Sequence, residues 1–210
     1  LFTTFSINGE EVSLLQANPL KHVQSLDINE GIHRRNTTWN TIHGEINLKS
    51  ERFVSLVNSH LICLKYTLTV NQNCELIIKT GIDGDVWDIN GFHLENYKVE
   101  NINELIKVSS RTQELKVPVV VTEVCIRKFE SKEVIEKGEK SIFRNIKFKA
   151  EPKVEYTIYK YISVYTGNDE TSNIEGDCEI DTRRASKNGY EKDFNERSEE
   201  HTSELQSPIR

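Results

Sequence analysis

Apolar side chains recur at every second position through most of residues 1–166, and this period of two constrains the fold more than any other feature. In Leu61–Val70 the even-numbered positions carry the apolar side chains, while Lys65 and two threonines occupy the other face. Residues 154–164 are apolar or aromatic on both faces, which is typical of a strand inside a layered sheet. Several such runs at short spacing predict an all-β fold, an antiparallel β-sandwich.

Turn signals between the runs indicate how the strands connect. Asn8-Gly9 lies between two alternating runs and predicts a tight hairpin within residues 5–14, because both residues tolerate a positive φ. A polar turn at Asn71–Asn73 separates two apolar runs, so we expect residues 61–70 and the strand that starts at Leu76 to pair as an antiparallel hairpin.

Two further segments carry weaker signals. Val117–Ile126 is nearly continuous in β-branched residues, as expected of a strand covered on both faces, and Pro118 near its start predicts an edge position or a bulge. Ile102–Ser109 is the one place before residue 166 where we expect a short helix.

The composition changes after Thr166. Gly167–Asp181 is polar and acidic, which predicts a linker. Asp181-Thr182 is a candidate cap for a helix from Arg183 through Tyr190 towards Phe194, although Gly189 interrupts that pattern.

The two ends of the sequence suggest an incomplete reading frame. The chain starts at Leu1 in the middle of a strand pattern and contains no Met, so we expect a fragment of a longer protein that lacks its opening strands. Residues 197–207 have no apolar face and resemble the in-frame translation of a widely used short-read sequencing adapter. We therefore expect residues 197–210 to be a non-native tail, and we leave them out of the fold argument.

Charge and composition exclude several classes of function. The net charge of -6 is diffuse and gives no reason to expect a nucleic-acid partner. No apolar run approaches the roughly 20 residues of a membrane helix, and no signal pattern opens the chain, so we expect no membrane partner and a cytoplasmic location. The four cysteines are scattered, which predicts buried thiols and no zinc site; they are Cys63, Cys74, Cys125 and Cys178.

The segment Thr80–Leu94 is the most unusual in the chain, with glycines, aspartates, an aromatic plane and a histidine in one loop. Carboxylates that hold hydroxyl pairs and an aromatic ring that covers a sugar face are what carbohydrate binding requires, and Trp87, Asp88 and His93 are the candidate residues. The alternative is a turn-rich connection whose aspartates bond their own backbone and whose Trp87 packs on the sandwich edge. The acidic spacing does not match a calcium loop, and we expect no metal.

Three arginines are candidates for anion binding. Arg34 and Arg35 precede Trp39, and Arg52 follows Glu51. Structural ion pairs on the sandwich surface are the competing explanation for them. The sequence contains no glycine-rich phosphate-binding loop, no G-x-S-x-G nucleophile motif and no H-E-x-x-H zinc motif. We therefore expect no catalytic residue and no cofactor site in this chain.

Six strings occur along the chain in a specific order and spacing: Leu26–Trp39, Leu48–Leu56, His60–Tyr66, Thr80–Gly84, Ser163–Thr166 and Lys187–Glu191. They resemble the N-terminal domain of glycoside hydrolase family 65, and the similarity covers nearly all of residues 1–196. The loop from Asp83 to Leu94 is most similar to the trehalose, kojibiose and nigerose phosphorylase branch.

The resemblance implies a supersandwich of the galactose-mutarotase-like kind over residues 1–166, then a linker and linker helix over residues 167–196 that lead to an α/α-barrel. In the family that absent barrel carries the general-acid glutamate and the phosphate pocket. The complete protein would cleave an α-glucosyl disaccharide such as trehalose, kojibiose or maltose with inorganic phosphate as co-substrate. We expect a homodimer, an inactive isolated chain, and a rim or interdomain role for Trp87, Asp88 and His93.

Two other functions stay open at this point. An independent carbohydrate-binding sandwich would bind sugar without the barrel. A related glycoside hydrolase would use the same sugars with water in place of phosphate, because a fold does not fix a function.

Overall fold

The computed structural model describes residues 2–15 and 17–196, and nearly all of the regular structure in residues 2–166 is β-strand. In chain order the elements are β1 (Phe2–Ile7), β2 (Glu10–Val12), β3 (Lys21–Asp27), β4 (Ile32–Thr41), β5 (Gly44–Val54), β6 (Leu61–Val70), β7 (Cys74–Asp83), β8 (Trp87–Asp88), β9 (Gly91–Phe92), β10 (Leu94–Ile102), β11 (Leu105–Thr112), β12 (Pro118–Arg127), β13 (Lys132–Lys137), β14 (Ser141–Ala150), β15 (Tyr156–Thr166) and α1 (Ile174–Asn188).

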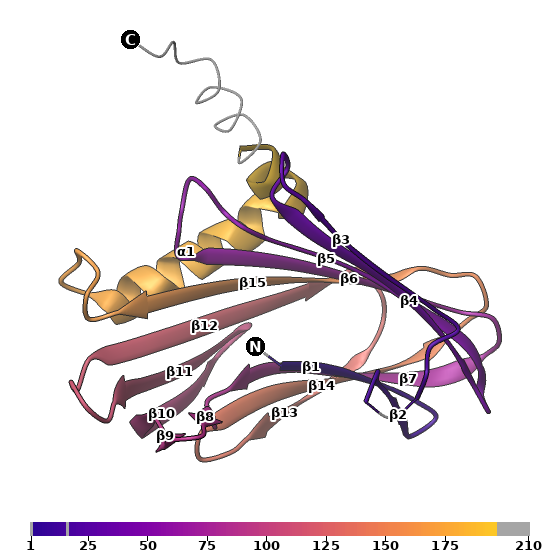
Figure 1. The fold of residues 1–210 in the computed structure, drawn as a ribbon, viewed down its shortest axis with the longest axis horizontal. Coiled ribbons are helices and arrows are strands. Elements are labelled where there is room, and N and C mark those ends of the chain that lie inside the picture. The colour runs from indigo at the N-terminus through magenta and orange to yellow at the C-terminus, as the bar shows by residue number, and fades with distance from the viewer. Residues whose placement is uncertain (1, 16, 197–210) are drawn as a thin grey trace, which may run out of the picture.

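The strands form two antiparallel sheets that face each other (Figure 1). The larger sheet has the order β10-β11-β12-β15-β6-β5-β4-β3, and the smaller one has the order β13-β14-β7-β1-β2. Strands β8 and β9 make a separate two-stranded ribbon beside this sandwich. The predicted all-β antiparallel sandwich is confirmed. The proposed non-native tail at residues 197–210 lies outside the described residues.

The hairpin at Asn8-Gly9 is confirmed, whereas the second predicted hairpin is wrong. Asn8 and Gly9 have φ values of 48° and 89°, and β1 pairs with β2 around them. Strand β6 pairs with β5 and β15, but β7 pairs with β1 and β14, so the turn between β6 and β7 carries the chain from one sheet to the other. Leu68 of β6 and Ile78 of β7 are both buried in one apolar cluster, because the two strands face each other across the core instead of pairing edge to edge.

Two weaker predictions also need correction. Residues 102–109 do not form a helix: β11 occupies most of this range and pairs with β10 and β12. Pro118 does not mark an edge, because β12 lies between β11 and β15. It is the first residue of its strand, where a residue without an N–H costs the ladder least.

The space between the sheets is apolar at its two ends and ionic in the middle. One apolar cluster includes Trp39, Leu48 and Phe148, and the other includes Ile82, Ile106 and Ile142. Between them lie Glu123 of β12, Lys160 of β15 and Arg144 of β14, which are at most 2% exposed. Nζ of Lys160 is 3.0 Å from Oε2 of Glu123, and Nε of Arg144 is 3.7 Å from Oε1 of the same carboxylate.

Arg144 and Lys160 also form hydrogen bonds with partners at the edges of the interior. Nη1 of Arg144 donates to Glu133 at 2.9 Å, and Arg127 donates to the other oxygen of the same carboxylate at 2.6 Å. Nζ of Lys160 donates to the backbone carbonyl of Phe2 at 3.2 Å and to Oγ1 of Thr3 at 3.1 Å. The ionic cluster therefore joins strands β1, β13 and β14 of the smaller sheet to β12 and β15 of the larger one.

Helix α1 covers the outer face of the larger sheet, over β12 and β15 (Figure 1). It begins at Ile174, well before the predicted start at Arg183, and its N-cap is Asn173, whose side chain accepts from the amide of Gly176 at 3.0 Å. The boundary was misplaced because the buried face of the helix is small and partly polar: Cys178, Thr182 and Ala185. Such a face gives no apolar stripe in the sequence.

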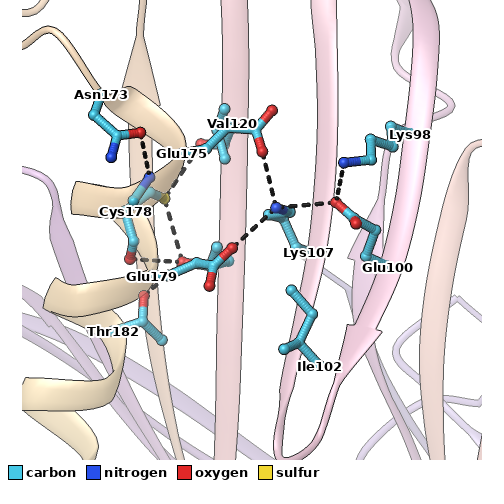
Figure 2. A network of polar contacts seen from close by, with 12 residues as sticks. Lys98, Glu100, Ile102, Lys107, Val120, Asn173, Glu175, Cys178, Glu179 and Thr182 are labelled. Atoms are coloured by element: carbon cyan, nitrogen blue, oxygen red, sulfur yellow. Dashed lines mark hydrogen bonds and ion pairs between the residues drawn. The ribbon is translucent and has the colours of Figure 1, made fainter.

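Figure 2 shows how charged and polar groups hold this helix on the sheet. Lys107 of β11, whose side chain is 4% exposed, lies 3.0 Å from Glu175, 2.9 Å from Glu179 and 2.9 Å from Glu100. Burial by itself lowers the pKa of Lys107, but the three carboxylates outweigh it and the pKa ends above the ordinary lysine value. Beside it, the hydroxyls of Thr122 and Thr182 are 2.6 Å apart.

The proposed helix cap at Asp181-Thr182 is therefore wrong, since both residues lie inside α1. Oδ2 of Asp181 accepts from the hydroxyl of Tyr165 at 2.6 Å and from Nδ2 of Asn58 at 2.6 Å. After α1 the chain is helical again over residues 190–196, where Tyr190 and Phe194 pack on Phe53 with ring centroids 5.3 and 5.5 Å apart. Within the described residues no helix is both long enough and apolar enough to cross a membrane.

The four cysteines are buried and unpaired, as the sequence predicted. Burial is the main cause that raises the pKa of the Cys125 thiol to about 12 and that of Cys178 to about 11. These thiols are therefore protonated at neutral pH and serve as small packing groups.

We predict that Glu123→Gln lowers the free energy of unfolding by about 3–5 kcal/mol, because it leaves the ammonium of Lys160 buried without its counter-charge. Urea denaturation would measure the loss. The matched control is Glu155→Gln, which breaks an exposed pair with Lys49 at 3.5 Å and should cost less than about 1 kcal/mol. Equal losses in the two variants would contradict a special role for the buried charge.

Candidate functional site

The candidate site is the short hairpin that follows β7 at one end of the sandwich, made of β8, the turn Ile89-Asn90 and β9 (Figure 1). Trp87 pairs with Phe92 and Asp88 pairs with Gly91. Gly91 has a φ of 110°, a conformation that L side chains rarely adopt, so glycine is needed to close this turn.

Glycine is also needed at the base of the hairpin. The amide of Gly84 donates to the carbonyl of Lys140 at 3.1 Å, and a Cβ at Gly84 would lie 2.4 Å from that oxygen. The hydroxyl of Tyr97 donates to the carbonyl of Gly84 at 2.8 Å. Nζ of Lys140 lies 4.2 Å from the ring centre of Phe92, a cation–π contact that ties the hairpin to the β13–β14 turn.

The aspartates of the loop bond locally, as the turn-rich explanation of the sequence proposed. Asp83 accepts from the amide of Asp85 at 3.0 Å, and Asp88 accepts from the amide of Asn90 at 2.6 Å. The carboxylate of Asp85 forms an ion pair with the ammonium of Lys140 at 2.8 Å. Among the described residues, no group of three or more histidines, cysteines and carboxylates is arranged to hold a metal ion.

Trp87 does not fit the explanation of this loop as a turn-rich connection. Trp87 is 69% exposed, so it is not packed on the sandwich edge. Its neighbours Val86, Ile89 and Phe92 are exposed as well. The hairpin thus presents an apolar surface of four side chains, which is more than an isolated surface hydrophobe.

Asp88 and His93 are brought together as an ion pair. Nε2 of His93 is 2.9 Å from Oδ1 of Asp88, and Nδ1 is 3.7 Å from Oε1 of Glu114 in the β11–β12 turn. The contact with Asp88 raises the pKa of His93 above the ordinary histidine value. The amide of Asn90 and then the imidazole lower the pKa of Asp88.

Trp87 and Asp88 lie on β8 of this hairpin, and His93 directly follows β9. The exposed ring of Trp87 can stack on an apolar face of a ligand, and Asp88 and His93 form a polar pair that can bond to hydroxyls. Trp87 and Asp88 are adjacent on β8 and point to opposite faces of the ribbon. Sequence reasoning missed Glu114 and Lys140, which reach the hairpin from other turns. Nothing local in the sequence signals either contact, because both depend on how the sheets bring distant turns together.

We predict that Asp88→Asn lowers the pKa of His93 towards its ordinary value, measured by NMR titration of the imidazole ring protons. Glu114→Gln is the matched control and should lower it less, because its carboxylate is farther from the ring. Since the pKa of His93 is raised, the contribution of the pair to stability is complete below about pH 6.5 and is lost as pH rises through the folded-state pKa. Since the pKa of Asp88 is lowered, the contribution of the pair to stability is also lost as pH falls through the folded-state pKa of Asp88. An unchanged His93 titration in Asp88→Asn would contradict the pair.

Comparison with known proteins gives consistent relatives. The chain is 33% identical, over 91% of its length, to nigerose phosphorylase of Lachnoclostridium phytofermentans. It is 26% identical over 80% of its length to 1,2-alpha-glucosylglycerol phosphorylase of Bacillus selenitireducens, and 29% identical over 80% to alpha,alpha-trehalose phosphorylase of Thermoanaerobacter brockii. It spans only 28%, 22% and 24% of the lengths of these relatives.

The fold has a close match among solved structures. A protein described as "Putative kojibiose phosphorylase from human microbiome" superposes with a TM-score of 0.86 over 95% of this chain and 27% of that one. At 15% sequence identity, this likeness concerns the fold. The model of the N-terminal domain of glycosyl hydrolase family 65 matches residues 1–206, and the chain belongs to this family.

Proposed function

We propose that the complete polypeptide is a glycoside phosphorylase that cleaves an α-glucosyl disaccharide with inorganic phosphate. The observation that carries this proposal is the family match, together with three relatives from different bacteria that are each named as phosphorylases. Trehalose, kojibiose, nigerose and maltose are the candidate substrates. We propose a cytoplasmic location, consistent with the scattered, unpaired cysteines.

The chemistry explains why we assign catalysis to a part of the protein other than this chain. An inverting glycosidase needs one carboxylic acid to protonate the leaving oxygen and one carboxylate to activate water. Phosphate is already an anionic nucleophile, so a phosphorylase needs the acid and a basic phosphate site. Attack from the opposite face of an α-glucoside would give β-glucose 1-phosphate and a free sugar. The aspartates of the Trp87 hairpin are held by local partners, which suits a contact surface better than a proton donor.

In this proposal the sandwich supports an α/α-barrel domain and contributes to a homodimer. Helix α1 and residues 190–196 are held on the outer face of the larger sheet, by ion pairs near Lys107 and by aromatic contacts near Phe53. The chain thus leaves the sandwich in a fixed direction. The exposed hairpin with Trp87, Asp88 and His93 would face the barrel or the rim of its substrate site. The isolated chain is expected to be inactive.

The first test is phosphate dependence. The complete polypeptide, incubated with trehalose, kojibiose, nigerose or maltose, should release glucose 1-phosphate only when inorganic phosphate is present. The same panel without phosphate is the control, with glucose release as its readout. Glucose release at the same rate in both conditions would identify a hydrolase and reject the proposal.

The second test concerns the hairpin. Trp87→Ala in the complete enzyme should lower kcat/KM for the disaccharide by roughly tenfold, since stacking of an aromatic ring contributes on the order of 1 kcal/mol or slightly more. Ile42→Ala is the control, because Ile42 is also exposed but belongs to the β4–β5 turn. Unchanged kinetic constants in Trp87→Ala, with a lower melting temperature, would show that the ring only packs.

A free-standing carbohydrate-binding module is the second candidate, favoured by the exposed ring of Trp87. Calorimetric titration of this 210-residue chain with trehalose or kojibiose distinguishes the two. Binding that Trp87→Ala abolishes would support the module, whereas no binding would favour a contact that needs the rest of the enzyme.

A further inference from the structure

Two arginines and a histidine gather on the inner face of the larger sheet, away from the Trp87 hairpin. His33 and Arg35 lie on β4, and Arg52 lies on β5. His33 is the register partner of Arg52, and Arg35 is the register partner of Ser50. Partners in register point to the same face, and this is the face that carries Tyr66 of β6, which packs on Phe5 across the sandwich.

Arg35 and Arg52 differ from every other arginine in residues 2–15 and 17–196. Each of the others lies within ion-pair distance of a carboxylate: Arg34, Arg111, Arg127, Arg144, Arg183 and Arg184. Within the same ranges, Arg35 and Arg52 pair with none. The explanation by surface ion pairs therefore holds for Arg34 but not for these two.

Among the described residues no carboxylate pairs with the half-buried Arg35, whereas Arg52 is exposed to solvent. Nε of Arg35 is buried and has no hydrogen-bond partner among the described residues, an arrangement that proteins usually avoid. Burial, followed by the charge of Arg52, lowers the pKa of His33. Burial also lowers the pKa of Arg35, again with repulsion from Arg52. An anion placed among them would relieve both effects.

A cavity of about 100 Å³ lies between these side chains. Gln24, Ser50 and Tyr66 add polar groups to its wall. Glu51 also lines it, but its carboxylate is 3.6 Å from Nε of Arg34 and 3.5 Å from Nζ of Lys65. Those partners lie on the opposite face of the sheet, since adjacent strand residues alternate. The cavity has several times the volume of one water molecule, about 30 Å³ in the liquid, which suits a small oxyanion.

We propose that His33, Arg35 and Arg52 form a binding site for a phosphoryl group, supplied either as inorganic phosphate or by a small sugar phosphate. Two guanidinium groups offer planar pairs of donors that match the oxygens of a tetrahedral anion. The Ser50 and Tyr66 hydroxyls can bond the remaining oxygens. The ring of His33 borders the site and is held by the Gln24 amide, with Nε2 of His33 3.1 Å from Oε1 of Gln24.

The test counts phosphate sites on the complete polypeptide by equilibrium dialysis with radiolabelled inorganic phosphate at constant ionic strength. Arg35→Gln and Arg52→Gln should each weaken one site by roughly ten- to a hundredfold, the usual effect of removing a charged hydrogen-bond donor. Arg34→Gln is the matched control: it changes the neighbouring residue on the other face and should leave every site intact. Near-UV circular dichroism checks the fold, and the exposed Arg52 provides a second variant if Arg35→Gln unfolds.

The outcomes separate this site from the proposed activity. A catalytic phosphate site would persist in all variants, so the loss of one site in Arg35→Gln relative to Arg34→Gln supports the proposal whether or not the polypeptide is a phosphorylase. Displacement of the label from that site by glucose 1-phosphate would identify a sugar phosphate as a ligand, and failure to displace it would leave inorganic phosphate. Equal site numbers and affinities in Arg34→Gln, Arg35→Gln and Arg52→Gln would overturn it.

Discussion

The carboxylate of Glu123 lies between the two sheets and contacts a cationic side chain from each of them. It is fully buried in β12, and its counter-charges come from β15 in its own sheet and from Arg144 of β14 in the other. Taking such charges out of water costs several kcal/mol for each ion, so they persist only where partners stand in fixed places. Sliding one sheet past the other by one residue, about 3.3 Å, would carry Arg144 away from Glu123. The buried charges therefore favour the observed alignment of the two sheets, together with the apolar clusters on either side of them.

Much of this architecture could be predicted from local patterns, and its failures have a common cause. The period of two located β6 and β15, a nearly continuous run of β-branched residues located β12, and Asn8-Gly9 located the first hairpin. Strand exposure and turn chemistry are local properties. Pairing is not local. The turn between β6 and β7 has the same composition as a hairpin turn, yet it carries the chain across the core. Helix α1 was placed too late because its contact face is Cys178, Thr182 and Ala185, and its attachment depends on Lys107, far away in the sequence.

At the candidate hairpin, too, the sequence predicted some features and left others open. The residue types of Thr80–Leu94 were sufficient to single out Trp87, Asp88 and His93, but they could not decide between a sugar contact and a packed turn. The structure divides the loop between the two: the aspartates bond to backbone and to Lys140, as a turn requires, whereas the ring of Trp87 stays exposed. Exposure depends on whether another element covers the loop, and none of the described residues covers the ring of Trp87.

Among the described residues, Arg35 and Arg52 have no carboxylate partner because side chains alternate between the two faces of a strand. The chain has 33 acidic and 27 basic residues, so carboxylates are in excess and an arginine ordinarily finds one. Arg34 and Arg35 are adjacent and must point to opposite faces of β4. Asp27, Glu30 and Glu51 all lie within ion-pair distance of Arg34 on one face, and Arg35 shares the other with His33 and Arg52. At this end of the larger sheet the carboxylates lie on one face, and on the other face the buried Nε of Arg35 has no hydrogen-bond partner among the described residues. A bound anion would supply that partner.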